Sequence, residues 1–143
     1  MNDSKRQDIA LLVLRLAIAA TFIGHGGQLL FGLFGGPGLE GITSSQGQVM
    51  GTLVAVGEFF GGLGMLLGLL TRFTALAQIV IMLGAIVKVH LPNGFFLPKG
   101  YEYNVVLISI MVTILLLGPG KYAIGRFLPL PKTADGQPVP ALE

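Results

Sequence analysis

Four long apolar stretches alternate with short polar segments along the chain, and only a few polar side chains interrupt each stretch. The stretches cover residues 9–31, about 49–70, 73–89 and about 104–117. With its flanks, each comes close to or falls within the roughly 17 to 25 residues of a membrane-spanning helix. Because hydrocarbon offers no hydrogen-bond partners to a backbone, such segments are predicted to be helical. We therefore expect an all-α integral membrane four-helix bundle.

The overall composition supports a membrane protein. Of the 143 residues, 52% are hydrophobic and 11% are charged, whereas about 25% of the residues of a soluble domain are charged. The chain contains no cysteine, so a redox role requires a bound cofactor or a partner rather than a thiol relay. The net charge of +2 includes no basic cluster beyond Lys5 and Arg6, which indicates no nucleic-acid site.

The polar segments predict how the spans are joined. Residues 32–48, GLFGGPGLEGITSSQGQ, are predicted to form a loop with short helical turns. The second and third spans meet at Thr71 and Arg72 with almost no linker, and residues 90–102 combine prolines with aromatic side chains suited to the headgroup layer. Residues 1–126 are thus expected to form one membrane domain that ends in a short interfacial helix, and residues 127–143 a flexible tail with several prolines.

The distribution of lysine and arginine predicts the orientation. Cytoplasmic connections are enriched in these residues. In a four-span topology, six of them lie on the side of the termini and two on the other side: Lys5, Arg6, Arg72, Lys121, Arg126 and Lys132 against Lys88 and Lys99. Both termini are therefore expected in the cytoplasm.

Glu58 lies inside the second span, among glycine, leucine, methionine and phenylalanine residues. A charge near the bilayer centre costs at least about 2.5 to 3.5 kcal/mol on insertion scales, so it normally faces other helices, a partner or water. At a rise of about 1.5 Å per residue, Glu58 lies roughly 13 Å deep, between the levels of Arg15 and His25. Two alternatives follow for Glu58: a role in binding or proton transfer, and a structural ion pair. The basic residues available for such a pair are Arg15, His25, Lys88 and His90.

Further polar residues gather in the same outer half of the bundle. His25 lies near the end of the first span, His90 closes the third, and Glu102 and Asn104 open the fourth. Each is a candidate ligand-binding residue, and each also has a plainer interpretation, because polar side chains are tolerated where a helix reaches the interface. Arg15 has both interpretations too, since its long side chain can extend to the cytoplasmic interface.

A row of glycines follows one face of the second span. Gly57, Gly61, Gly64 and Gly68 recur at intervals of four, three and four residues. Small residues in such a row let a neighbouring backbone approach closely. We interpret the row chiefly as helix packing, with Glu58 one position round from it.

Metal and nucleotide sites find little support in the sequence. His25 and His90 are the minimum for bis-histidine ligation of a haem between helices, but nothing in their spacing requires a haem. The sequence contains no zinc motif, glycine-rich nucleotide loop or nucleophile elbow. We predict no metal site.

Four segments in this order resemble the DoxX family of small bacterial and archaeal membrane proteins. They are LRLAIAATFIGHGGQLLFG, GEFFGGLGMLLGLLTRFTALA, KVHLPNGFF and EYNVVL. The resemblance implies a four-helix protein of the plasma membrane, with links to thiosulfate:quinone oxidoreduction, oxidative-stress defence, or complexes that contain sulfur-transfer or superoxide-removing partners. The residues that match the recurrent polar pattern of the family are Arg15, His25, Glu58, His90, Glu102 and Asn104.

The polar cluster and the resemblance together lead to one main hypothesis, a redox-associated subunit that binds a quinone or a quinone-like aromatic compound. A quinone site requires an apolar slot, hydrogen-bond donors and a path for protons. The residues assigned to these tasks are Phe22, Phe59 and Met65 for the walls, His25 or Arg15 as donor, and Glu58 for proton transfer.

Two alternatives belong to other functional classes. One is a noncatalytic membrane anchor or adaptor for an oxidative-stress or sulfur-metabolism complex, in which the glycine row binds a partner helix. The other is a small proton-coupled transporter of weak acids or phenolic compounds. Four spans are few for a monomeric carrier, so a transporter is expected to form a homodimer.

Overall fold

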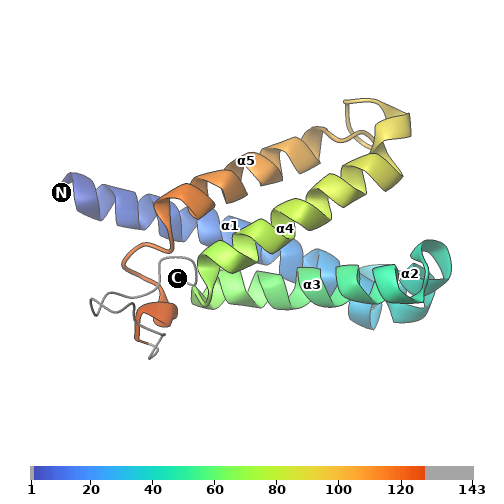
Figure 1. The fold of residues 1–143 in the computed structure, drawn as a ribbon, viewed down its shortest axis with the longest axis horizontal. Coiled ribbons are helices and arrows are strands. Elements are labelled where there is room, and N and C mark those ends of the chain that lie inside the picture. Colours follow the sequence, from blue (N-terminus) through green and yellow to red (C-terminus); the bar gives the residue numbers. More distant parts are fainter. Residues whose placement is uncertain (1, 128–143) are drawn as a thin grey trace, which may run out of the picture.

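The computed structural model describes residues 2–127, and this part of the chain is helical, without strands. Lys132 and the predicted tail beyond Phe127 lie outside the described residues. The long helices α1, α3, α4 and α5 run in alternating directions, so that α1 begins and α5 ends at the same end of the molecule (Figure 1). The predicted all-α fold is confirmed. The five α-helices are α1 (Asp3–Phe31), α2 (Gly38–Gln46), α3 (Gln48–Leu67), α4 (Thr71–Ala85) and α5 (Glu102–Leu117).

Helix α1 extends beyond the apolar stretch that predicts it. Asn2 caps its first turn by accepting a hydrogen bond from the backbone N–H of Lys5 at 3.1 Å. At the other end, Gly32 adopts a left-handed conformation with φ of 71°, which commonly ends a helix. The 29 residues of α1 rise about 43 Å, more than the roughly 30 Å of a hydrocarbon core. The polar first turns of α1 therefore extend past the apolar layer.

The segment between α1 and α3 is more regular than the predicted loop. It contains a short 3₁₀ turn, Leu33–Gly35, and the nine-residue helix α2. Gly47, with φ of 87°, separates α2 from α3. Helices this short are marginal on their own. Because α2 packs against both α1 and α3, tertiary contacts explain its formation.

Helices α3 and α4 form the predicted hairpin with almost no linker. Residues 68–70 connect them, and Gly68 and Leu70 both have positive φ. Beyond α4 the helical path continues through a π-helical turn, Ile86–His90, and a 3₁₀ turn, Leu91–Asn93. Such π turns often occur at functional sites, and this one carries His90.

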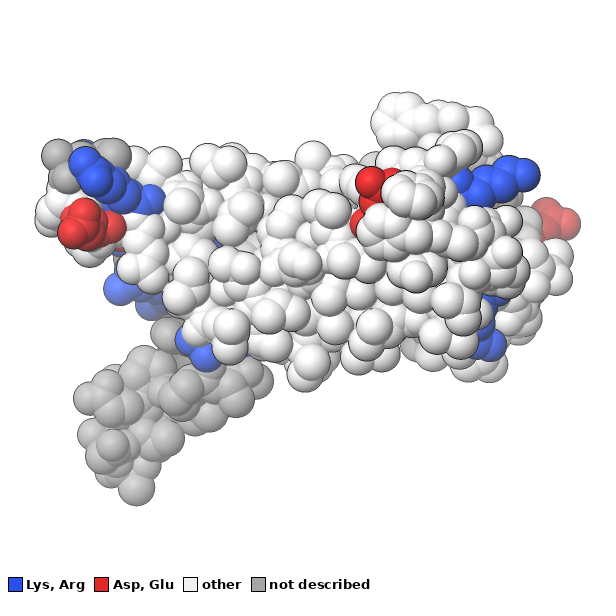
Figure 2. Space-filling view, turned by 90° about the horizontal axis from the view of Figure 1, so that it is seen from above, with Lys and Arg blue, Asp and Glu red and all other residues white. Residues whose placement is uncertain are grey.

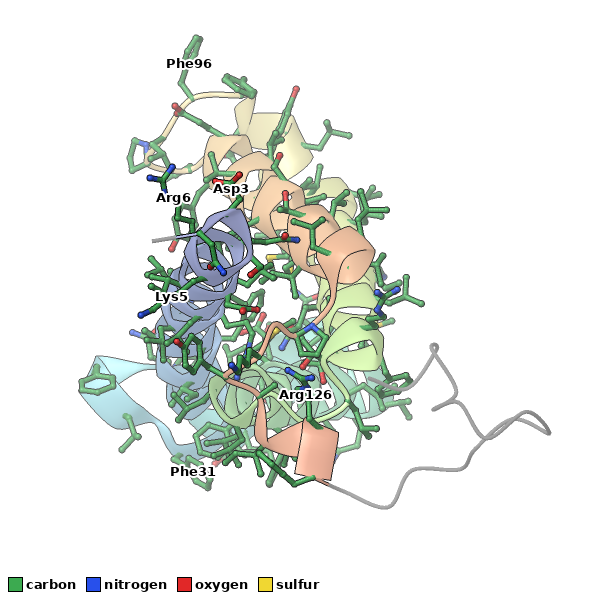
Figure 3. The ribbon with its side chains drawn as sticks, turned by 90° about the vertical axis from the view of Figure 1, so that its left-hand side faces the viewer. Asp3, Lys5, Arg6, Phe31, Phe96 and Arg126 are labelled. Atoms are coloured by element: carbon green, nitrogen blue, oxygen red, sulfur yellow. The ribbon has the colours of Figure 1, made fainter. Side chains whose placement is uncertain are left out.

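The long helices share one interior. Helix α1 packs on α3, α3 on α4, α4 on α5, and α5 on α1. Figure 3 looks along them from the end that carries Asp3, Lys5 and Arg126. The buried hydrophobic core comes from all four helices and consists of Ile18, Ala19, Phe22, Met65, Ala75, Met82, Leu107, Met111 and Ile114.

The glycine row of α3 packs within the chain. Cβ atoms added at Gly57, Gly61 and Gly64 would contact or overlap side chains of α4, whereas one at Gly68 would meet the segment after α5. The row thus brings α3 and α4 close together, as small residues do in membrane helices. Because α4 covers most of it, the row is not the free surface that the adaptor hypothesis requires.

The outside of the helices is apolar along their middle. Figure 2 shows the charged side chains of one face gathered toward the two ends of the molecule. Within residues 2–127, three helical segments are long and apolar enough to cross a membrane: Asp3–Phe31, Gln48–Leu67 and Thr71–Asn93. Helix α5 is also apolar but has only 16 residues. Large exposed hydrophobic side chains include Val13, Leu53, Phe60, Val80 and Leu116.

Candidate functional site

A cavity of about 240 Å³ lies between α1, α3, α4 and α5, beneath the connection from α4 to α5. We call it the central cavity. It gathers polar side chains from four helical segments within largely apolar walls, which is the usual character of a small-molecule site. Its lining residues are Thr21, Phe22, His25, Glu58, Met82, Ala85, His90, Leu97, Pro98, Gly100, Tyr103, Asn104 and Leu107.

Glu58 reaches the central cavity from the middle of α3. The buried residues of this helix recur at intervals of three or four, which places Ala55, Glu58 and Gly62 on the face that turns inward. Glu58 is only 6% exposed, and its Oε2 atom has no hydrogen-bond partner within the described residues. A buried polar atom without a partner is costly. Glu58 Oε2 is therefore the atom in this cavity with the strongest need for a partner.

The ion-pair alternative for Glu58 is contradicted. Within residues 2–127, the pair of opposite charges in contact is Arg6 with Asp3, at 3.8 Å on the surface. Glu58 forms no such pair there, and Arg15 points its guanidinium group elsewhere. Glu58 does face neighbouring helices, as expected, but the groups around it are histidine, amide and apolar side chains rather than arginine.

Arg15 is bound entirely by backbone carbonyls. It is 1% exposed and lies outside the central cavity. Its guanidinium donates to carbonyls in the last turn of α3 and in the segment after α5, so it joins these two parts of the chain at the end opposite the cavity. The acceptors are Met65 O at 3.0 Å, Leu66 O at 3.1 Å, Pro119 O at 3.0 Å and Tyr122 O at 3.2 Å.

His90 enters the cavity from the π-helical turn beyond α4. Its Nδ1 atom lies 2.8 Å from the carbonyl oxygen of Lys99. A carbonyl only accepts, so Nδ1 carries the hydrogen, and Nε2 of the neutral ring is an acceptor. His25 lines the cavity from α1. The two histidines predicted as candidates therefore border the same space as Glu58.

Helix α5 contributes a hydroxyl and an amide. The hydroxyls of Tyr103 and Thr21 are 3.3 Å apart. Because the hydroxyl of Thr21 also donates to Ala17 O at 3.1 Å, Tyr103 is the donor of the pair. Asn104 is 6% exposed and donates to the sulfur of Met82 at 3.4 Å. A thioether is a weak acceptor, so a ligand oxygen is a better partner for this amide.

Besides Arg15, three predicted site residues lie outside the central cavity. Phe59 follows Glu58 by one residue, which turns it about 100° round the helix, and it packs edge-to-face on Phe31 and Phe60. Met65 shares the inward face with Glu58 but lies two turns nearer to Arg15, fully buried in the core. Glu102 accepts a hydrogen bond from Leu97 N at 3.2 Å, so it fixes the loop over the cavity instead of lining it.

The sequence analysis missed three polar residues near the site. Thr21 and Tyr103 line the cavity, and Gln78 donates to the carbonyls of Gly57 and Glu58 at 3.1 and 3.3 Å. Gln78 could have been found, because an amide in the middle of the third apolar stretch requires an explanation. Tyr103 is 42% exposed, as a headgroup-layer residue can be, but it also borders the cavity and its hydroxyl reaches Thr21.

The described residues contain no group of three or more histidine, aspartate or glutamate side chains that is arranged to hold a metal ion. The polar groups that line the central cavity are one carboxylate, two imidazoles, a phenol, an aliphatic hydroxyl and an amide. These groups exchange protons and form hydrogen bonds, which suits a ligand with oxygen atoms on an otherwise apolar frame.

Comparisons with known proteins support the conclusion that this chain is a membrane protein. A family model described as DoxX matches residues 10–91, a range that includes His25, Glu58 and His90. The chain is 29% identical over 140 residues to the uncharacterized membrane protein Rv3486 of Mycobacterium tuberculosis, across 89% of this chain and 86% of that protein. No solved structure matches the chain significantly.

Proposed function

This chain belongs to the DoxX family of membrane proteins, and from that premise we propose that its central cavity binds the ring of a quinone or of a quinone-like aromatic compound. The protein is a multi-pass membrane protein. We place it in a redox system in which a partner or a bound cofactor supplies the electrons, since the chain has no cysteine.

The proposal includes a bundle of four spans with both termini in the cytoplasm. Helix α5 would be the fourth span, extended by the aromatic residues before it. Lys5, Arg6 and Arg126 belong to the end that carries the described termini (Figure 3), and the α4–α5 connection contains Lys99. The excess of positive charge near the termini supports a cytoplasmic location.

We expect single cysteines to report this topology, because the chain has none of its own. Ser4→Cys, Lys99→Cys and Lys121→Cys alter exposed positions. In intact cells, a membrane-impermeant maleimide should label only Lys99→Cys, and the other two variants should react after permeabilisation. Labelling of Lys121→Cys in intact cells would show that α5 does not cross the membrane. Labelling of Ser4→Cys in intact cells would show that the N-terminus lies outside the cell.

The size and walls of the central cavity support a ligand of one or two rings. Pockets for drug-sized ligands are roughly 300 to 1,000 Å³, and the central cavity has about 240 Å³. Phe22, Met82 and Leu107 provide the apolar walls. Aromatic and thioether groups are favourable neighbours of a flat ring.

Glu58 carries the proposal, because its Oε2 atom is buried without a partner beside this cavity. A reduced quinone presents hydroxyl groups, which donate to a carboxylate, and an oxidised quinone presents carbonyl groups, which accept from a protonated one. Glu58 thus matches both forms by holding or releasing one proton. Nε2 of His90 and the hydroxyl oxygen of Tyr103 can accept further hydrogen bonds from the hydroxyl groups of the reduced form.

Glu58→Gln should weaken binding of the reduced quinone about tenfold or more, since the loss of a hydrogen bond to a charged group costs about 1.5 to 3 kcal/mol. The oxidised quinone should be affected less, because the amide of glutamine can still donate to a carbonyl. The measurement is an anaerobic calorimetric titration of the protein in nanodiscs with tail-free naphthoquinone and benzoquinone, in reduced and oxidised form. Glu102→Gln is the matched control, because its amide oxygen can still accept from Leu97 N. The absence of saturable binding, or equal affinities of the two variants and the original protein, would refute the proposal.

A further inference from the structure

A second hollow opens between α3 and α4. Figure 1 shows that these helices diverge as they leave their short connection. The space between them has a volume of about 490 Å³, and α2 covers its outer end. Its walls are mainly aliphatic, with Met50, Leu53, Val80 and Ile81 among them. We call it the α3–α4 groove.

The α3–α4 groove adjoins the central cavity. Glu58, Ala85 and His90 line both spaces. Glu58 and His90 thus lie between the two spaces. The central cavity on one side is smaller and partly polar, and the groove on the other side is larger and mainly aliphatic. A molecule that filled both would be polar and compact at one end and hydrocarbon at the other.

We propose that the α3–α4 groove holds the isoprenoid tail of a membrane quinone whose ring lies in the central cavity; this inference rests on the proposed function. Because the tail is surrounded by hydrocarbon in the lipid as well, the groove holds it by close van der Waals packing rather than by the hydrophobic effect. Side chains of α1, α2, α3 and α4 line the groove, and its open side between α3 and α4 lets the rest of the tail continue into the lipid.

The alternative route for a tail lies between α1 and α5. A recess of about 260 Å³ opens there and also borders the central cavity, with which it shares Thr21, His25 and Tyr103. These residues and Gln28 make the recess largely polar. The Thr21–Tyr103 hydrogen bond crosses between α1 and α5 at this point. The aliphatic groove is therefore the better match for a tail.

Two glycines allow the two routes to be tested by the same substitution. A Cβ added at Gly84, which lines the groove, or at Gly24, which lines the recess, meets no atom within 4 Å. The Cβ atom of a leucine at either position therefore displaces no neighbouring atom. Gly84→Leu narrows the groove, and Gly24→Leu narrows the recess.

The experiment compares a tail-free naphthoquinone with menaquinone in nanodiscs, for the original protein, Gly84→Leu, Gly24→Leu and Glu58→Gln. Size-exclusion profiles establish that each variant is folded. Gly84→Leu should weaken menaquinone binding about tenfold or more and leave the tail-free ring unaffected, because only the tail needs the groove. Gly24→Leu should change neither affinity.

The inference is overturned if Gly84→Leu leaves menaquinone binding unchanged, if it weakens both ligands equally, or if Gly24→Leu is the variant that selectively weakens menaquinone. Failure of the proposed function has a different signature, because the tail-free ring then does not bind the original protein. In that case, menaquinone binding that is weakened by Gly84→Leu but not by Glu58→Gln would support the groove as a tail site and would refute the ring site in the central cavity.

Discussion

Replacing Arg15 with leucine should lower the free energy of unfolding by about 3 kcal/mol or more. The buried guanidinium donates four hydrogen bonds to backbone carbonyls, and each buried acceptor that loses its donor costs about 1 to 3 kcal/mol. For a chain of this size, we expect the Tm to fall by about 10 °C or more. The measurement is the fraction of monodisperse protein that survives heating in detergent, followed by size-exclusion chromatography.

Two control variants separate the carbonyl contacts from the charge. Arg15→Lys retains the charge, but an ammonium cannot reach four carbonyls in the way that a planar guanidinium does, so an intermediate loss of stability is expected. Arg72→Leu removes an arginine whose one hydrogen bond, to Leu116 O, is 3.5 Å long, and its effect should be small. Equal melting of Arg15→Leu and Arg72→Leu would contradict the role assigned to Arg15.

Alanine at Gly26 should destabilise the protein by about 1 to 3 kcal/mol or more, the cost of overpacking a close contact. A Cβ at this position would lie 2.5 Å from the Cα atom of Phe59, where α1 and α3 cross closely. At the same crossing, a Cβ added at Gly62 of α3 would lie 2.7 Å from the backbone nitrogen of Ile23 in α1. Because these neighbours are backbone atoms, the helices must separate to admit the methyl group.

Gly24 provides a control of opposite sign on the same helix. A Cβ there meets nothing within 4 Å, and alanine is favoured over glycine inside a helix by up to about 1 kcal/mol. Gly24→Ala should therefore leave the Tm unchanged or raise it, while Gly26→Ala lowers it, in the same heating assay. A rise of the Tm in both variants would show that α1 and α3 do not pack as closely as described.

Much of the fold follows from local patterns in the sequence. The apolar stretches gave the four long helices with boundaries close to those observed, and the DoxX resemblance is confirmed by the family match. Helix α2 was underestimated because its nine residues depend on packing against α1 and α3, and such contacts have no local signature. The glycine row predicted a close helix contact, and α4 is the helix that makes it.

The site could be predicted only in part. His25, Glu58, His90 and Asn104 were identified as polar residues at similar depth, and they line one cavity. Depth along a helix follows from a fixed rise per residue, so sequence position is informative about it. Rotation about the helix axis within a bundle is set by packing, which is why Phe59 was placed in the site and Tyr103 was left out.

The sequence by itself determined that this chain is helical, that it is apolar enough for a membrane, and that one carboxylate lies deep within a span. Only the tertiary structure decided the partners of each polar group. Arg15 was one of the candidate partners of Glu58, yet its acceptors are carbonyls from the end of α3 and from residues after α5. Every residue has a carbonyl, so no side-chain pattern distinguishes those acceptors, and only the packing of distant segments brings them within reach of one guanidinium.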